Sequence, residues 1–439
     1  MRLLHTSDWH LGVQTMGHSR AADHEGLLAE IHDIAVDFKP HLILHTGDVW
    51  HSSRPAETDI QRGMSALAAL GQVAPVVVVA GNHDSPALFQ GFQTLVEATG
   101  AAGTRIAFCP RVRRPEQGGI LEFTGEPGER IRLAVVPYIR PGQIVDPFDD
   151  GQTWTGTYAD TVREVEAVLD KGLLDGYDSA TDVLLFAAHL HLHGARWSAR
   201  SGMREVSVTE DYATLADSIP SVSYAAFGHI HLPQAIPSAV GRYAGSILQV
   251  DFGEVGEEKS VVLVEAKPRK PVSITVQPLV RARRLHHVVS RLDDLAAHAA
   301  EVGNGMAWVH IECEQDIADL AAEVQRRLPD AYLLDCVPIV AGRQPKQLGS
   351  QLESDVEVEP PLTELYVDYL SRQGVRRSSP ELAAQSFSTL LTSVRDHEPL
   401  TVSEEAGMAR AVKAAEQVAD ASISDVLEAS KEPIEGSEA

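Results

Sequence analysis

The chain has 439 residues, of which 44% are hydrophobic, so it can bury a substantial core and disorder of the whole chain is not expected. Its formal net charge of −25 argues against a protein that coats nucleic acid through net electrostatic attraction. Three cysteines without a CxxC pair, a polar N-terminus and the absence of an apolar stretch of about 18 residues predict a cytoplasmic protein with reduced thiols and no membrane span.

Up to about residue 265, the sequence repeats one arrangement, in which a short apolar run stops at a polar loop. Such runs, when bounded by Gly, Asp or Asn, predict buried strands. The expected strands are Leu3–Leu4, His41–His45, Pro75–Val79, Asp182–Phe186 and Tyr224–Phe227. Between them, Ala21–Phe38 and Glu57–Leu70 have helical spacing. This alternation predicts an α/β layered domain whose polar loops gather at one end of the sheet.

The next segments, Arg242–Leu248 and Lys259–Leu279, are rich in strand signals and poor in helix signals. We expect them to form a second, more antiparallel sheet. From about Leu285 the pattern changes to a small β-α-β-α-β unit. Its strands are expected at His286–Ser290, Met306–Glu312 and Ala331–Val340, and its helices at Leu292–Ala300 and Asp316–Leu328.

The C-terminal part of the chain combines acidic segments with two amphipathic ones. Gly342–Pro361 is expected to be a linker, followed by helices near Leu362–Gln373 and Pro380–Arg395. Two such helices cannot bury both apolar faces alone, so they are expected to dock on a partner or, alternatively, on the small unit. Thr401–Ala439 contains nine acidic and three basic residues, which predicts a flexible tail.

The polar loops supply seven side chains with oxygen or nitrogen ligand atoms. They are Asp8, His10, Asp48, Asn82, His189, His229 and His231. A set without thiolates suits Mn²⁺, Fe²⁺, Mg²⁺ or Zn²⁺ rather than a structural zinc site. Seven ligands are too many for one ion that keeps a position open for water. They fit two ions about 3.5–4 Å apart that share one carboxylate, an arrangement that lowers the pKa of a bridging water toward ~7 and clamps a phosphate.

Two further residues lie beside the expected ligand Asn82. His83 is placed to stabilise the transition state of phosphate hydrolysis or to protonate the leaving oxygen. Asp84 is expected to accept a hydrogen bond from an imidazole and so to fix its orientation.

The loop motifs together resemble the calcineurin-type metallophosphoesterase superfamily. These motifs are Asp8-Trp9-His10, Gly47-Asp48, Gly81–Asp84, His189 and Gly228–His231. Within the superfamily, Gly47–Pro55 and Arg242–Ser246 resemble the SbcD family of bacterial nuclease subunits. The resemblance implies a four-layer αββα phosphoesterase domain at residues 1–280 and a capping domain at residues 281–345. It also implies a linker with helices for an SbcC-type SMC-like ATPase at residues 346–400, before the tail at residues 401–439.

The resemblance also assigns an activity and roles to single residues. It implies an Mn²⁺-dependent, nucleoid-associated DNA nuclease for repair, recombination and replication, which acts as a homodimer in a heterotetramer. Its activities would be 3′–5′ exonuclease on double strands and endonuclease on single strands and hairpins. One cation would be bound by Asp8, His10 and His231, and the other by Asn82, His189 and His229. Asp48 would bind both. His83 matches the catalytic histidine, and His51 matches a histidine of the archaeal branch, which leaves its role open.

Several residues allow a simpler interpretation. His191 and His193 share a strand face with His189, but His189 ends the apolar run and is preferred as the ligand. His5, His45, Trp9 and Trp50 are expected to serve packing or to support ligands. The basic clusters Arg111–Arg114 and Arg281–Arg284 are equally consistent with DNA phosphate contacts and with ordinary surface charge.

Two other functions remain as alternatives. The first is a two-metal phosphatase or cyclic-nucleotide phosphodiesterase of the same superfamily, which would not need the chain beyond Leu285. The second is a non-catalytic scaffold with a vestigial site, which the complete set of expected ligands disfavours.

Overall fold

The computed structural model describes residues 1–98, 105–140, 147–148, 157–198, 214–315 and 317–340. Every element described below belongs to one compact unit, Met1–Pro345. The expected helices near Leu362–Gln373 and Pro380–Arg395 and the expected tail lie outside the described residues. Among the helices of the described residues, none combines the length and the apolar character needed to cross a membrane.

The first sheet has six strands in the order β14-β13-β1-β4-β5-β6. Its parallel part consists of β1 (Arg2–Thr6), β4 (Leu42–His45), β5 (Val76–Val79) and β6 (Ile106–Cys109). Strands β13 (Ser260–Glu265) and β14 (Ser273–Pro278) extend it in antiparallel fashion. The central strands β4 and β5 are buried at every residue, which is why their sequences are continuous apolar runs.

The second sheet has the order β11-β12-β10-β9-β8-β7. Its strands are β7 (Ile120–Thr124), β8 (Arg130–Val136), β9 (Asp182–His189), β10 (Tyr224–Gly228), β11 (Gln234–Ala235) and β12 (Gly241–Tyr243). Strands β8, β9, β10 and β12 are parallel neighbours, and only the two edge strands are antiparallel.

The expected second, more antiparallel sheet was therefore wrong. Within Arg242–Leu248 only the residues of β12 are in a strand, and β12 joins a mainly parallel sheet. The strands within Lys259–Leu279 extend the first sheet through the pairing of β13 with β1. Alternation and composition predict that a segment is a strand, but they carry no information about which edge it pairs with.

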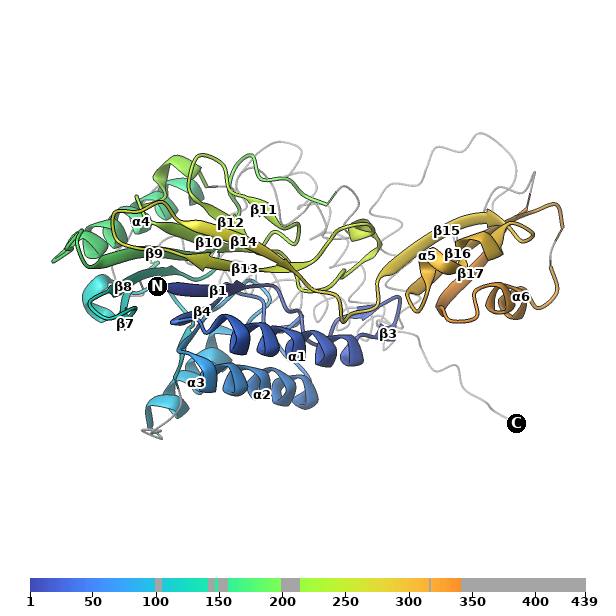
Figure 1. Ribbon diagram of the computed structural model, residues 1–439, viewed down its shortest axis with the longest axis horizontal. Helices are drawn as coiled ribbons and strands as arrows, with labels where there is room; N and C mark the ends of the chain where they lie inside the picture. The colour runs from blue at the N-terminus through green and yellow to red at the C-terminus, as the bar shows by residue number, and fades with distance from the viewer. Residues whose placement is uncertain (99–104, 141–146, 149–156, 199–213, 316, 341–439) are drawn as a thin grey trace, which may run out of the picture. The chain divides into compact units, whose positions relative to one another are not determined.

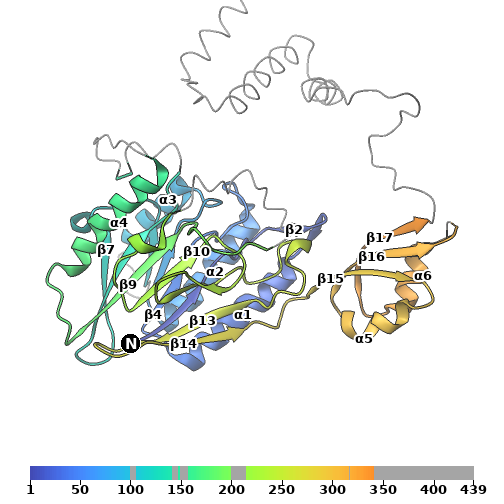
Figure 2. The same ribbon diagram turned by 90° about the horizontal axis from the view of Figure 1, so that it is seen from above.

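The two sheets form the inner layers of a four-layer αββα domain, which confirms the expected fold class. One apolar cluster joins their facing sides, for example Leu44 and Val77 from the first sheet with Leu133 and Leu185 from the second. The outer helices are α1 (Ala21–Phe38), α2 (Glu57–Val73) and α3 (Pro86–Ala98) on the first sheet and α4 (Tyr158–Leu174) on the second. Figure 1 shows α4 on one side of the paired sheets and α1, α2 and α3 on the other, and Figure 2 shows the same layers from above.

A small module follows, made of the parallel strands β15 (Leu285–Arg291), β16 (Met306–Cys313) and β17 (Tyr332–Val340). Its helical segments are η7 (Leu295–His298), α5 (Ala299–Val302) and α6 (Leu320–Arg327). The predicted β-α-β-α-β order is confirmed, although the first helix is a 3₁₀ turn followed by one short α-turn. Short elements elsewhere are β2 (Gln14–Thr15), β3 (His18–Ser19), η1 (Pro115–Gln117), η5 (Ala216–Ser218) and η6 (Phe252–Glu254).

The segment that leads into the small module is held by buried acidic residues of α1. The carboxylate of Asp23 accepts hydrogen bonds from the backbone and the guanidinium of Arg283 and from Arg20. Glu30 accepts the backbone N–H groups of Val280 and Arg281 at 2.9–3.1 Å. The cluster Arg281–Arg284 thus contributes ion pairs and hydrogen bonds at the junction of the modules.

The turn η6 also contacts the small module. The ring of Phe252 lies 5.3 Å from the ring of Trp308, centroid to centroid, and packs against the buried side chains of Leu285, Met306 and Leu334. The residues of this contact come from both sides of the junction. The small module is therefore joined to the four-layer domain by side-chain packing as well as by the connecting segment at residues 280–284.

Candidate metal centre

The side chains of the predicted site follow the carboxyl ends of five strands. Asp8 and His10 follow β1, Asp48 follows β4, and Asn82 follows β5. His189 ends β9, and His229 and His231 follow β10. The carboxyl ends of parallel strands meet at one edge of a sheet. Because the two sheets are stacked, this edge collects predicted ligands from both.

The backbone of the site is unusual, since Asp8, His10, Asp48 and His229 all have left-handed conformations with φ between 46° and 97°. Such conformations are uncommon for residues other than glycine and cluster at functional sites. Backbone hydrogen bonds hold them: Asp8 donates to the carbonyl of Gly47 at 2.9 Å, and His10 donates to that of Asp48 at 3.0 Å. The turns thereby direct successive polar side chains into the same space.

Two glycines are needed for the close approach of these loops. A Cβ atom at Gly47 would lie 2.1 Å from Nδ1 of His189, and one at Gly81 would lie 2.1 Å from Oδ1 of Asp48. Both distances are far shorter than a van der Waals contact, so glycine at these positions allows the loop backbone to pack directly on ligand side chains.

Asp8, His10 and His231 form the first group of potential ligand atoms, which lie within 4.8 Å of one another. The Nε2 atoms of His10 and His231 are 2.9 Å apart. All three side chains are buried. The residues predicted to bind one cation are therefore adjacent.

Asn82, His189 and His229 form the second group. Oδ1 of Asn82 lies 2.9 Å from Nε2 of His189 and 2.9 Å from Nδ1 of His229. Oδ2 of Asp48 lies 3.4 Å from Nε2 of His189 and 3.8 Å from Nε2 of His10, which belongs to the first group. Asp48 thus lies between the two groups, where the predicted bridging carboxylate has to be.

The hydrogen bonds of two imidazoles show that this set of atoms fits cations. Nδ1 of His231 faces a carboxylate oxygen of Glu254 at 2.7 Å, and Nδ1 of His189 faces the carbonyl of Thr46 at 2.7 Å. Both partners only accept, so each Nδ1 carries a proton, and Nε2 is the nitrogen that offers an electron pair when the ring is neutral. These electron pairs face the nitrogen of His10 and the oxygen of Asn82. At such distances a proton or a cation has to lie between the facing atoms, and a bound cation would meet this need at both contacts.

The pKa shifts agree with a site built for positive charge. Burial lowers the pKa of His10 and His229 well below 6.5, so both imidazoles have free electron pairs at neutral pH. Burial would raise the pKa of Asp48, but the neighbouring His189 holds it well below the ordinary range. For His189, burial is outweighed by the charge of Asp48, which raises its pKa to about 9.

His83 and His51 lie at the accessible side of the centre, His83 half-buried and His51 exposed. The backbone N–H of His83 donates to Oδ1 of Asp48 at 2.8 Å, and its Nδ1 lies 2.8 Å from the carbonyl of His51. The ring of His83 is 4.9 Å from that of His10 and stacks on that of His51 at 5.5 Å. The structure therefore places His51, whose role the sequence left open, in the cluster next to the predicted catalytic histidine.

Asp84 has a different role from the expected one. Its carboxylate accepts backbone N–H groups of Asp48 and Gly81, both at 2.9 Å, and of Trp50 at 3.3 Å. It thus ties together the loops after β4 and β5 instead of orienting an imidazole. Burial, followed by the charge of Asp48, raises the pKa of Asp84 to about 7.

Three contributors to the centre were not predicted from the sequence. Glu254 contacts His231, as described above, and lies 23 positions further along the chain. The ring of Tyr138 stacks near that of His229 at 6.1 Å, and Arg140 donates to the carbonyl of Asp84 at 2.9 Å. Both follow β8, a buried strand with a strong apolar pattern, and that pattern was the available signal for them.

Two of the other histidines follow His189. His193 is exposed, as expected for a solvated loop, whereas His191 is half-buried and packs against Trp197 at 4.9 Å, which a solvated loop does not predict. His5 is buried between the hydroxyls of Tyr224 and Thr46, at 3.0 and 2.9 Å.

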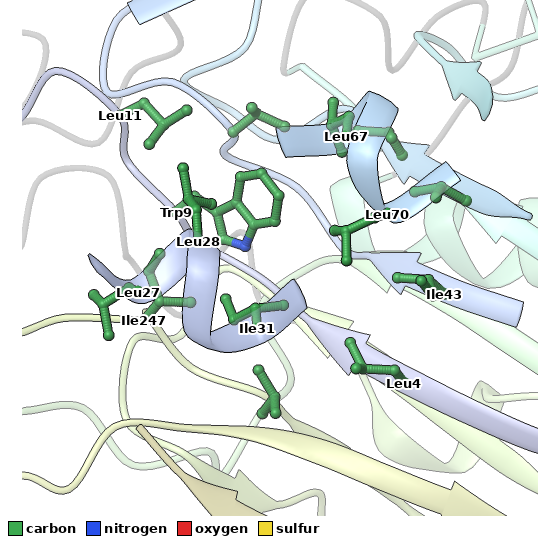
Figure 3. Close-up of a cluster of buried hydrophobic side chains, with 14 of the residues drawn as sticks. Leu4, Trp9, Leu11, Leu27, Leu28, Ile31, Ile43, Leu67, Leu70 and Ile247 are labelled. Carbon is green, nitrogen blue, oxygen red and sulfur yellow. The ribbon is translucent and has the colours of Figure 1, made fainter. Parts of the chain in front are cut away.

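His45 lies against the ring of Trp9 at 4.6 Å. Trp9 and Trp50 are fully buried in the core under α1 and α2, as predicted, and Figure 3 shows Trp9 among Leu27, Leu28 and Leu67.

Arg111 and Arg113 line a cavity of about 220 Å³ between α3 and the strands β6 to β8.

Comparison with known proteins adds the following. A family model described as calcineurin-like phosphoesterase matches residues 1–233. The SbcD subunit of the nuclease SbcCD from Bacillus subtilis (strain 168) is 30% identical over 350 residues, which cover 76% of this chain and 83% of that protein. The SbcD subunit from Escherichia coli (strain K12) is 26% identical over 428 residues, which cover 91% of this chain and 100% of that protein. The SbcD subunit from Rhodobacter capsulatus is 25% identical over 351 residues, 75% of this chain and 84% of the relative.

Proposed function

Because the chain belongs to the calcineurin-like phosphoesterases and, within them, to the SbcD subunits of SbcCD nucleases, we propose that it cuts the DNA backbone with two divalent cations. The proposed cations are Mn²⁺, with Mg²⁺ as a weaker substitute. The proposed activities are 3′–5′ exonuclease on duplex ends and endonuclease on single strands and hairpins, in the repair and recombination of DNA.

The position of Asp48 between two ligand groups carries this proposal. One cation would be held by Asp8, His10 and His231, and the other by Asn82, His189 and His229. Asp48, whose Oδ2 faces His10 and His189, would contribute to both. Bound there, two divalent cations supply Lewis acidity, which activates water and neutralises charge on the scissile phosphate.

His83 is the residue proposed to act on the leaving group. The carbonyl of His51 accepts the proton of its Nδ1, so Nε2 is the nitrogen left for the substrate. The backbone N–H of His83 is fixed to Asp48, which holds the ring at a constant place beside the ligands. A protonated Nε2 can donate to the oxygen on which charge develops as the P–O bond breaks.

The partner is proposed to be an SbcC-type SMC-like ATPase, which contacts the predicted helices between residues 346 and 400. The name of the relatives describes them as one component of a complex. The net charge of −25 supports a division of labour in which the partner provides much of the attraction for DNA. If the chain alone bound duplex DNA as tightly as the complex, this division would be wrong.

The test compares substrates at matched concentrations of Mn²⁺, Mg²⁺ and chelator. The substrates are linear duplex DNA with free or blocked 3′ ends, a DNA hairpin, bis-nitrophenyl phosphate and nitrophenyl phosphate. We expect cleavage of the DNA substrates and the diester in Mn²⁺, with and without the ATPase, and little cleavage of the monoester. Preferential hydrolysis of nitrophenyl phosphate would instead support the alternative of a two-metal phosphatase.

A further inference from the structure

We propose that Glu254 is a positioning residue, which keeps the proton of His231 on Nδ1 and thereby leaves Nε2 free to bind a cation. The inference rests on the proposed function in one respect, namely that His231 serves as a metal ligand. It concerns a residue that the ligand motifs do not contain and that lies outside the segment matched by the family model, which ends at residue 233.

The first observation is that the contact between Glu254 and His231 is buried. Glu254 is 0% exposed and ends the turn η6. Its Oε1 atom lies 2.7 Å from Nδ1 of His231, while Nε2 of the same ring faces His10 at 2.9 Å. A buried carboxylate is costly unless it is fully paired, so its place next to this ring is a specific feature of the fold.

The second observation is an asymmetry between the two oxygens of Glu254. Oε2 lies 2.8 Å from Nζ of Lys259 and accepts the backbone N–H of Val250 at 3.1 Å and, at 3.4 Å, the hydroxyl of Ser246. An ammonium group and a backbone N–H can only donate. Oε2 therefore has to be an acceptor, and Oε1 is the atom directed to His231.

This asymmetry makes the isosteric change Glu254→Gln informative. The amide oxygen of the glutamine would have to face Lys259 and Val250, because those groups can only donate. Its NH₂ group would then face Nδ1 of His231, which would become an acceptor. The neutral imidazole would carry its proton on Nε2, the nitrogen that a cation needs.

The chain offers a matched control in Glu257. Its carboxylate forms an ion pair with the same Lys259 at 2.7 Å, and Lys259 also donates to the backbone carbonyl of His231. Glu257→Gln thus removes the same charge from the same lysine. It leaves the contact between Glu254 and the imidazole in place.

The first experiment detects the proton directly. Long-range ¹H–¹⁵N spectra of the full chain, with labelled histidine, are recorded in chelator at alkaline pH, and His231→Gln assigns the signal. We expect His231 to carry its proton on Nδ1 in the wild type and in Glu257→Gln, and on Nε2 in Glu254→Gln. A wild-type ring protonated on Nε2 would overturn the inference, whether or not the variant folds.

The second experiment measures binding of Mn²⁺ to the full chain by calorimetry. The loss of an outer partner of a ligand histidine typically costs 10–100-fold in affinity, and we expect such a loss at one of two sites in Glu254→Gln. Glu257→Gln should bind as the wild type does. If the wild type binds two Mn²⁺ ions and Glu254→Gln binds them with unchanged affinity, the positioning role alone is refuted. If the wild type does not bind two Mn²⁺ ions, the proposed function is refuted.

Discussion

Two clusters of histidines in this protein differ in what surrounds them. In the metal centre, the Nε2 atoms of His10 and His231 are 2.9 Å apart. In the small module, Nε2 of His287 and Nδ1 of His310 are 2.8 Å apart, next to the ring of Trp308. The distances are nearly equal, so proximity of imidazole nitrogens does not distinguish the clusters.

The difference lies in the carboxylates and in the burial. Asp8 and Asp48 join the first cluster, and both are buried. His287 is exposed on the sheet, and among the described residues the pair of His287 and His310 belongs to no group of three potential ligands. Imidazoles meet in both places, on neighbouring strands in the small module and in loops after strands in the metal centre. The acidic oxygens of the metal centre come from Asp8 and Asp48, which lie in turns with left-handed conformations.

The largest difference between the two clusters should disappear when the carboxylate of Asp48 is neutralised. Asp48→Asn keeps the shape of the side chain but removes the charge between the ligand groups. Loss of metal-based charge stabilisation of about 4 kcal/mol corresponds to roughly a 10³-fold decrease in rate. Cleavage of bis-nitrophenyl phosphate in Mn²⁺ measures the loss, and calorimetry should show fewer bound ions. An active Asp48→Asn protein would contradict the bridging role.

A second change separates chemistry from ligand binding. His83→Ala removes the proposed proton donor but no proposed ligand, so we expect kcat to fall by about 10²-fold or more. The number of Mn²⁺ ions bound should stay the same, because the ligand groups remain. A parallel loss of bound ions would show that His83 acts through the metal site instead.

Burial of a third histidine, His24, predicts a pH dependence of stability. Burial lowers the pKa of His24 from 6.5 to about 4, and its Nε2 lies 2.8 Å from the carbonyl of Trp9. The neutral ring is favoured in the fold, so its contribution is complete above pH 6.5 and is lost as the pH falls toward about 4. The shift corresponds to about 3 kcal/mol.

His24→Gln, which retains a donor for Trp9, should flatten this dependence. Urea unfolding of both proteins in chelator between pH 7 and pH 4 measures it, a range set by the ordinary and lowered values of the histidine. If the free energies of unfolding of the two proteins fell in parallel, buried His24 would not be the cause.

The smallest effect is expected in the small module. The double change His287→Ala/His310→Ala should leave both the affinity for Mn²⁺ and the number of ions unchanged, because the two histidines belong to no group of three potential ligands within the part of the chain that the structure describes. The matched change His10→Ala/His231→Ala should remove binding at one site. Loss of an ion from the first variant would show that two imidazoles suffice.

Much of the metal centre was predictable because its residues directly follow apolar runs. The helix expected at Ala21–Phe38 has these bounds in the structure, and the loops after β1, β4 and β5 place Asp8, Asp48 and Asn82 as expected. In each case the signal is local: a run of buried residues fixes the strand, and the predicted ligand follows within three residues of the strand's end.

The remaining features depend on pairing between distant segments, which a sequence pattern does not encode. Strands β13 and β14 pair with each other and looked like a separate sheet, because their alternation is a local signal. The strand that joins them to the first sheet, β1, pairs with β13 and lies more than 250 residues earlier. Asp84 binds the backbone of Asp48 and Glu254 binds His231, and neither pairing follows from spacing. These are contacts of loops whose meeting point is set by the stacking of the sheets.

The turn η6 shows how few residues can serve two parts of the fold. Its first residue, Phe252, packs on the small module, and its last, Glu254, contacts His231. Surface loops usually tolerate changes in length. Here an inserted or deleted residue would displace either the aromatic anchor or the carboxylate, so this three-residue turn should keep its length even where neighbouring loops vary.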